Sequence, residues 1–336
     1  MENQIFESHH PNMDMDFITL NTGYKMPAMA LGTWKDEDLR SLIRTAIGIG
    51  YRHIDCAWFY RNENVIGDTL QDVYNEGKVK RENMYLTSKL WCQFNHPNDV
   101  REGFMQSLNN LQTDYLDAFL MHIPCAMPKT NDLTPVDEDG NYRHNNEIHY
   151  VDTWKEMEKL QKDGLVRSIG VSNFNKYQIN RILKECSIKP AVHLTESHPY
   201  LTDRNMVKFC KDNGIAVMAF GVLGSKRRKK PTIHDPILRQ DRVLKSIAEK
   251  REKNIAQIAI RFQIQRGIGA VINSSHESRL KSNFQVYDFE LSDEEMELIY
   301  DLNKDWRAFD LKWFLEGHKY WPHKPNYSED DSRQDE

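Results

Sequence analysis

The sequence has 336 residues, which is enough for one large or two ordinary domains. Its apolar fraction of 39% and charged fraction of 28% are typical of a globular protein, and a net charge of −5 argues against a general nucleic-acid binder. Five cysteines, without C-x-x-C spacing, indicate neither a zinc site nor a disulfide framework and suit a reducing compartment.

The two ends of the chain differ from the part between them. Residues 1–15 are expected to form a flexible leader, 16–325 a single domain, and 326–336 an acidic disordered tail. The first residues are polar and acidic, unlike a signal peptide, and no run of about 18 apolar residues suggests a membrane span. These features predict a cytoplasmic protein without a membrane partner.

The predicted elements begin with a hairpin. Residues 17–20 form its first strand, 21–23 its turn and 25–26 its return. Short apolar runs then predict eight strands, at 28–32, 52–56, 84–88, 115–121, 166–171, 191–196, 215–220 and 268–272. Helical patterns between them lie at 38–48, 63–77, 98–111, 152–163, 175–186, 203–213, 240–253 and 255–265.

This alternation favours a closed parallel (β/α)8 barrel over an open doubly wound sheet. No G-x-G-x-x-G motif follows the first predicted barrel strand, which weakens the open-sheet alternative. The long polar connections at 123–150 and 221–239 follow predicted strands. They therefore lie at the end of such a barrel where catalytic sites occur.

Four side chains at or just beyond predicted strand ends carry the chemistry. Asp55 and Tyr60 lie in GYRHIDCAWFY, Lys89 in MYLTSKLW and His122 in YLDAFLMHIP. A lone histidine of this kind is more often a core residue, and a lone Lys–Asp pair is more often structural. An acid, a phenol, an amine and an imidazole together are the parts of a proton-donating site.

In the order and spacing of these four residues, the chain resembles the aldo-keto reductases. The resemblance implies a single (β/α)8 barrel with a C-terminal tail on the substrate side, and reduction of a carbonyl by hydride transfer from a nicotinamide. It assigns Tyr60 as general acid, Lys89 as the residue that lowers the phenol pKa, Asp55 as the partner of Lys89, and His122 as the residue that orients the substrate oxygen.

The segment GVSNF at 170–174 is similar to the family's carboxamide-binding motif, which implies that Ser172 and Asn173 bind the nicotinamide amide. The alternative is a turn in which Asn173 or Asn175 caps the next helix. Leu194 replaces a glutamine that adds one hydrogen bond in the family, a loss of about 1 kcal/mol. Phe220 replaces a tyrosine but keeps a ring that can stack on the nicotinamide.

The phosphate-binding stretch departs further from the family pattern. It reads VINSSHESR from Val271 to Arg279, one residue shorter than usual, with Ser274 where the family often has lysine. Arg279 can still face a 2′-phosphate and Asn283 the adenine. The resemblance therefore implies NADPH as cofactor, with NADH possible. The cofactor-binding residues expected in all are Gly32, Thr33, Trp34, Asp55, Ser172, Asn173, Phe220, Leu223, Ser225, Lys226, Ser274, Ser275, Arg279 and Asn283.

Five consecutive cations at 226–230 lie where a family loop covers the cofactor pyrophosphate. A solvated surface run, or a patch like a nuclear-import signal, is the alternative reading.

Aromatic side chains are expected to form an apolar substrate pocket above the nicotinamide. The expected pocket residues are Trp34, Phe59, Trp91, His122, Ile123, Trp306 and Trp313, with Phe309 and Phe314 nearby. Ile123 replaces an aromatic residue common in the family and should widen the pocket. The tail aromatics are equally well explained by packing of the tail onto the barrel. The scattered histidines suggest no metal site.

Two functional hypotheses follow. The first is a monomeric reductase of aldehydes or ketones of medium size and apolar character. The second is a cofactor-binding structural or regulatory protein with little turnover, motivated by Leu194 and the altered 271–283 stretch.

Overall fold

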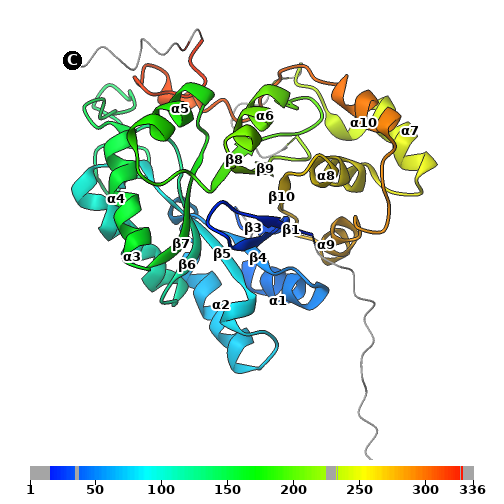
Figure 1. The fold of residues 1–336 in the computed structure, drawn as a ribbon, viewed down its shortest axis with the longest axis horizontal. Helices are drawn as coiled ribbons and strands as arrows, with labels where there is room; N and C mark the ends of the chain where they lie inside the picture. Colours follow the sequence, from blue (N-terminus) through cyan, green and yellow to red (C-terminus); the bar gives the residue numbers. More distant parts are fainter. Residues whose placement is uncertain (1–15, 35–37, 225–231, 233, 326, 328–336) are drawn as a thin grey trace, which may run out of the picture.

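A computed structural model describes residues 16–34, 38–224, 232, 234–325 and 327. Eight parallel strands form a closed barrel in the order β10-β3-β4-β5-β6-β7-β8-β9 (Figure 1). The strands are β3 (Met29–Gly32), β4 (His53–Asp55), β5 (Tyr85–Leu90), β6 (Leu116–Met121), β7 (Val166–Ser172), β8 (Val192–Glu196), β9 (Ala216–Phe220) and β10 (Gly269–Ile272). The predicted (β/α)8 barrel is confirmed, and each strand lies within two residues of its predicted bounds.

The predicted N-terminal hairpin is also confirmed. Strand β1 (Phe17–Thr19) pairs antiparallel with β2 (Lys25–Pro27), and the hairpin lies in front of the barrel strands in Figure 1. Its turn is fixed by hydrogen bonds from the Asn21 amide to the Pro190 carbonyl and between the Thr22 and Ser168 hydroxyls. Both contacts are made near the amino ends of β8 and β7, so the hairpin covers that end of the barrel.

Helices surround the barrel. Their bounds are α1 (Leu39–Ile49), α2 (Glu63–Asn75), α3 (Val100–Leu111), α4 (Tyr150–Lys162), α5 (Lys176–Glu185), α6 (Arg204–Asp212), α7 (Arg242–Lys250), α8 (Ile255–Gln265), α9 (Glu277–Phe284), α10 (Asp293–Tyr300) and α11 (Lys312–Leu315). Single 3-10 turns are η1 (Trp58–Tyr60), η2 (Arg81–Asn83), η3 (Cys92–Phe94), η4 (Pro97–Asp99) and η5 (Leu238–Gln240).

The predicted helices differ from the structure in two places. The helix expected over 98–111 begins as η4 and becomes α-helical only at Val100, since Pro97 fixes the first turn. Helices α9, α10 and α11, which follow the last barrel strand, were not predicted. Helix α7 contacts both α8 and α10.

Side chains fill the barrel interior. Residues such as Leu120, Val192 and Met218 form an apolar cluster there, and only a cavity of about 10 Å³ remains between them. His53 lies in this interior, with Nε2 2.8 Å from the Thr87 hydroxyl and Nδ1 3.2 Å from the Pro27 carbonyl. A ligand therefore has room only at an end of the barrel.

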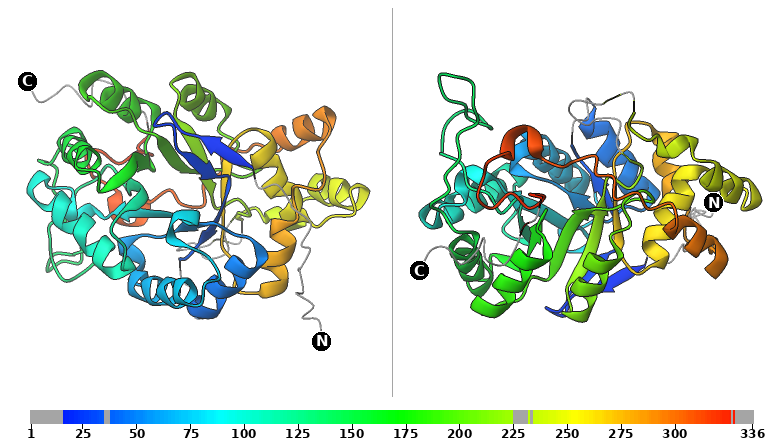
Figure 2. Two further views of the ribbon diagram at one scale, coloured as in Figure 1. Left: turned by 60° about the horizontal axis from the view of Figure 1, so that its bottom comes forward. Right: turned by 90° about the horizontal axis from the view of Figure 1, so that it is seen from above.

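The C-terminal segment crosses the end opposite the hairpin, as the orange-to-red chain in the right view of Figure 2 shows. Long-range hydrogen bonds hold it to the barrel loops. His144 Nε2 lies 2.9 Å from the Phe314 carbonyl, and the Gln178 amide donates to the Tyr320 carbonyl at 2.9 Å. This placement confirms the predicted C-terminal tail over the carboxyl ends of the strands.

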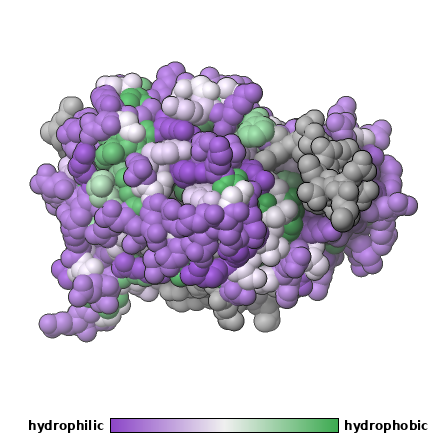
Figure 3. All heavy atoms as spheres, turned by 90° about the horizontal axis from the view of Figure 1, so that it is seen from below, coloured by the Kyte–Doolittle hydropathy of each residue, from purple (hydrophilic) through white to green (hydrophobic). Residues whose placement is uncertain are grey.

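The surface in Figure 3 is mostly hydrophilic, with small separate apolar areas. None of the described helices combines the length and the apolar character that crossing a membrane requires.

Candidate active site

Asp55 and Lys89 form a buried ion pair at the carboxyl ends of adjacent strands. Asp55 is the last residue of β4, and Lys89 is the next-to-last residue of β5. The Lys89 ammonium lies 2.8 Å from each carboxylate oxygen of Asp55 and donates to the Cys56 carbonyl at 2.6 Å. Burial opposes the ammonium charge, but the attraction of Asp55 outweighs it and raises the pKa of Lys89. Lys89 therefore stays protonated at neutral pH.

Tyr60 lies at the end of η1, beside this ammonium. The Lys89 nitrogen is 5.2 Å from the centroid of the phenol ring. Burial of the phenol raises the pKa of Tyr60 to about 12, while Lys89 lowers it. The expected influence of Lys89 on the pKa of Tyr60 is present, but burial of the phenol outweighs it. At neutral pH the phenol carries its proton.

His122 follows β6 and faces the same phenol, with ring centroids 6.0 Å apart. Burial and the nearby charge of Lys89 hold its pKa well below the usual value, so the imidazole is neutral. Its Nδ1 is buried without a hydrogen-bond partner among the described residues. The backbone on both sides is fixed, because the Asn173 amide donates to the His122 carbonyl at 3.0 Å and the His122 N–H donates to the Leu90 carbonyl. A neutral, fixed imidazole suits donation of a hydrogen bond to a carbonyl oxygen.

Asn173 has a left-handed backbone, with φ of 58°, directly after β7. Its side-chain amide donates to the Ser172 hydroxyl at 3.1 Å as well as to His122. The cap of the following helix is Asn175, which forms a capping box with Gln178. The alternative that Asn173 itself is the cap is therefore wrong. Among the described residues, the Ser172 hydroxyl proton and the Asn173 side-chain oxygen make no hydrogen bond, so both suit an external amide.

Leu194 pairs with Ser172 across the β7–β8 ladder, and its side chain belongs to the apolar barrel interior. Phe220 ends β9, and its ring lies 5.6 Å from that of Phe309. Leu223, two residues after the turn at Gly221, is partly buried.

Gly32 is the last residue of β3 and pairs with Asp55, and Thr33 and Trp34 follow it. The Thr33 hydroxyl is wholly buried and donates to the Asp55 carbonyl at 2.9 Å, so it helps to fix the backbone of this catalytic residue. The Asn273 amide donates to the Gly32 and Trp34 carbonyls, which ties β3 to the stretch after β10.

The expected phosphate residues lie at the start of α9. Ser274 is nearly buried and accepts a hydrogen bond from the His276 N–H, whereas Ser275 and Arg279 are exposed. The Arg279 guanidinium has no ion pair with any residue that the structure describes. Asn283 is buried on the same helix. Ser225, Lys226 and the rest of the basic run 226–230 lie outside the described residues.

Aromatic rings surround Tyr60 and His122. Phe59 stacks on Trp91 at 4.0 Å, Trp91 lies 5.3 Å from His122, and Trp34 lies 6.5 Å from Tyr60. The structure thus places Trp34, Phe59 and Trp91 beside the catalytic residues.

The other expected substrate residues lie further out. Trp313 contacts Phe314, whose ring stacks on that of Trp91. Ile123 is 2% exposed and packs in the core, and Trp306 packs on His198. Ile123 is as buried as Trp91, each being 2% exposed, so its place in the substrate pocket stays a prediction.

Glu196 was not predicted as a site residue, although it ends β8 at the same end of the barrel. Its carboxylate accepts hydrogen bonds from the Ala308 and Phe309 N–H groups. The carboxylate at a strand end could have pointed to Glu196 from the sequence. Its contacts with Ala308 and Phe309 could not be predicted, because these residues lie more than a hundred positions further along the chain.

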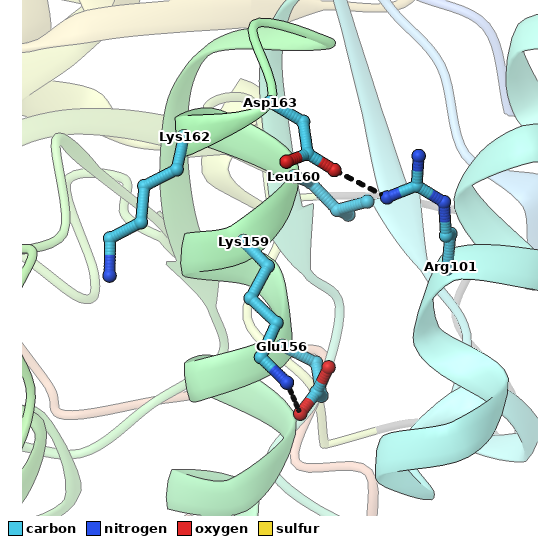
Figure 4. Close-up of a pocket in the computed structure, with 6 residues that line it drawn as sticks. All are labelled: Arg101, Glu156, Lys159, Leu160, Lys162 and Asp163. Carbon is cyan, nitrogen blue, oxygen red and sulfur yellow. Dashed lines mark hydrogen bonds and ion pairs between the residues drawn. The ribbon is translucent and has the colours of Figure 1, made fainter.

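A cavity of about 300 Å³ lies elsewhere, between α3 and α4 (Figure 4). Its charged residues already form pairs, Arg101 with Asp163 and Lys159 with Glu156, each at 2.6 Å. Within the described part of the chain, no three His, Cys, Asp or Glu side chains are grouped so that they could hold a metal ion.

The model of the aldo/keto reductase family matches residues 23–304. The chain belongs to the aldo/keto reductase family. It is similar to aldo-keto reductase family 1 member A1 of Xenopus tropicalis, with 41% identity over 296 residues, 87% of this chain and 90% of that protein. It is 41% identical to the human protein of the same name, over 86% of this chain and 90% of that one.

Among solved structures, the aldose reductase of Schistosoma japonicum superposes with a TM-score of 0.86 at 38% identity, covering 93% of this chain and all of that one. This aldo/keto reductase is therefore an oxidoreductase that acts on carbonyl groups with a nicotinamide cofactor. The family assignment favours the first hypothesis over a cofactor-binding protein with little turnover.

Proposed function

We propose that this aldo/keto reductase reduces aldehydes or ketones of medium size and apolar character, with NADPH as the preferred cofactor and Tyr60 as proton donor. The observation that carries the proposal is the Lys89 ammonium, which lies between the Asp55 carboxylate and the Tyr60 ring. This arrangement offers a protonated phenol and a fixed positive charge at one place.

The bound nicotinamide supplies the hydride. Tyr60 donates its proton to the oxygen that becomes the alcohol, and Lys89 stabilises the phenolate that remains. Asp55 keeps Lys89 charged through this change, since its carboxylate is within 2.8 Å of the ammonium. His122, neutral and fixed by Asn173, donates a hydrogen bond to the same oxygen and orients it.

The residues present fit a nicotinamide dinucleotide. Ser172 and Asn173 would bind the carboxamide, Phe220 would stack on the ring, and Arg279 would face the phosphates. Support comes from the exposed Arg279 guanidinium, which has no ion pair among the described residues and stands in the first turns of α9. A cation there favours a 2′-phosphate, and with it NADPH over NADH.

The rings of Trp34, Phe59 and Trp91 supply an apolar wall beside Tyr60 and His122. The pocket therefore fits an uncharged, largely apolar carbonyl compound better than a small polar one. A cytoplasmic, monomeric protein remains our prediction.

The test is a titration of the purified protein with NADPH and with NADH, followed by tryptophan fluorescence, and then addition of aromatic and aliphatic aldehydes. We expect tighter binding of NADPH and its oxidation on addition of an aromatic aldehyde. Cofactor binding without oxidation across a broad carbonyl panel would instead support the cofactor-binding hypothesis with little turnover.

A further inference from the structure

Glu196, the last residue of β8, carries a fully buried carboxylate that the catalytic residues do not use. Its Oε1 accepts from His198 Nε2 at 2.9 Å and from the Ala308 N–H at 2.7 Å, and its Oε2 accepts from the Phe309 N–H at 2.9 Å. The Arg307 guanidinium lies 3.9 Å from Oε2. Because a buried carboxylate forms strong hydrogen bonds, these contacts hold residues 307–309 against β8.

Residues 307–309 belong to no helix or strand, so their N–H groups have no hydrogen bonds of regular secondary structure in place of those to Glu196. The chain just before it is attached separately, because the Lys304 and Trp306 N–H groups donate to the Tyr200 carbonyl. Glu196 accepts the hydrogen bonds of the Ala308 and Phe309 N–H groups and thereby fixes the position of Phe309.

Phe309 connects two sides of the barrel mouth. Its ring lies 5.9 Å from Trp34, after β3, and 5.6 Å from Phe220, at the end of β9. Trp34 in turn lies 6.5 Å from Tyr60. The backbone at Gly221 also packs close to the Phe309 ring. Its φ is 66°, and a Cβ added there would lie 3.5 Å from the ring. A shift of Phe309 would therefore change the wall beside Tyr60.

We propose that Glu196 is a positioning residue, whose carboxylate fixes segment 307–309 and so keeps Phe309 beside Trp34 at the mouth of the active site. The proposal rests on the proposed function, since it concerns the binding of the carbonyl substrate there. It predicts weaker substrate binding when Glu196 is changed, with the chemical step preserved, because none of its contacts is to the catalytic residues.

Glu196→Gln is the direct test, because the side-chain amide offers one acceptor where the carboxylate offers two. Glu158→Gln is the matched control. The Glu158 side chain is also buried and also accepts two backbone N–H groups, from Ser187 and Ile188 at 2.7 and 2.8 Å. Those residues precede β8, at the other end of the barrel. Both of these N–H groups bind Oε1, an oxygen that glutamine retains, so Glu158→Gln controls for the loss of a buried negative charge away from the barrel mouth.

The two readouts are hydrogen exchange at the Ala308 and Phe309 amides and steady-state kinetics with an aromatic aldehyde. In Glu196→Gln alone, we expect exchange at these amides about tenfold faster and KM about tenfold higher, with kcat changed less than about threefold. Glu158→Gln should leave both readouts as in the wild type.

Unchanged exchange and KM in Glu196→Gln, or equal changes in both variants, overturn the proposal, as does a lower kcat with KM unchanged. Should Glu196→Gln not fold, Glu196→Asp keeps the charge but shortens the side chain by one methylene, and the same criteria apply to it. Exchange does not require turnover. A wild-type protein that reduces no carbonyl would refute the proposed function, and faster exchange in the variant would still support the anchoring of segment 307–309.

Discussion

The ammonium of Lys89 joins two residues whose pairing was expected from the sequence, Asp55 and Tyr60. The contact of Lys89 with Asp55 and Tyr60 could be predicted from the type of each side chain and its position at or just after a strand end, because the carboxyl ends of parallel barrel strands lie together. The pKa of Tyr60 could not be predicted in the same way. It depends on how completely the surrounding side chains exclude water, and here burial outweighs the charge of Lys89.

Ser274 tests cofactor choice. Ser274→Lys should strengthen binding of NADPH by roughly tenfold and that of NADH much less, because the added cation would pair with the 2′-phosphate that only NADPH carries. Fluorescence titration with both cofactors measures the difference.

Ser275→Lys is its control, since this neighbouring serine is exposed and the same charge would be placed one residue further along. Equal gains for both cofactors, or equal effects of the two variants, would show that position 274 does not face the 2′-phosphate.

At the scale of elements, the strands were predictable because each is a short apolar run between polar turns. Helix α9 was not, since its sequence ESRLKSNF is short and polar and buries only Leu280, Asn283 and Phe284. Its helical state depends on packing against α8 and against α1, which is far away in the sequence. Arg279 and Asn283 were therefore predicted as cofactor-binding residues without the helix that carries them.

Helix α5 offers a test of how the C-terminal segment is attached. Asn175 caps α5 in a capping box and also donates from its side chain to the Pro322 carbonyl at 3.2 Å. Asn175→Ala should lower the free energy of unfolding by about 1–2 kcal/mol, since it removes both the cap and this link.

Asn254→Ala is the control for this variant. Asn254 caps α8 with the same type of capping box, but its side chain makes no hydrogen bond to the described part of the C-terminal segment. Chemical denaturation of both variants should give the larger loss for Asn175→Ala. A loss in Asn254→Ala of the same size or larger would contradict a role of Asn175 in holding the segment.

At the scale of the whole molecule, the C-terminal segment and loop 123–150 are held by contacts between distant residues. The His318 ring lies 3.1 Å from the Ala126 carbonyl, and the His144 ring 2.9 Å from the Phe314 carbonyl. The length and polarity of loop 123–150 predicted that it lies over the site, and the family resemblance implied the same for the C-terminal segment. Neither predicted which atoms meet. Those contacts depend on the folded barrel.

Buried neutral histidines make stability depend on pH. Burial lowers the pKa of His53 to about 4 and that of His193 to about 3. An unfolded imidazole titrates near 6.5, so below that pH the unfolded state binds more protons than the folded state. Stability is then fully present above about pH 6.5 and falls as the pH falls. Each such group contributes up to about 1.4 kcal/mol per pH unit.

Denaturant unfolding at pH 7.5, 6 and 5 measures this slope, and His193→Asn should reduce it by removing one of the titrating groups. Stability that is constant or rises between pH 7.5 and 5 would contradict the burial of neutral imidazoles.

The most direct test of the proposed mechanism is Tyr60→Phe, which removes the phenol oxygen and leaves the ring. Reduction of an aromatic aldehyde by NADPH should fall at least about a hundredfold, since the general acid is lost. Affinity for NADPH should stay as in the wild type, because Tyr60 is not among the residues expected to bind it. Near-full activity in Tyr60→Phe would show that another group donates the proton and would overturn the assignment of Asp55, Tyr60, Lys89 and His122.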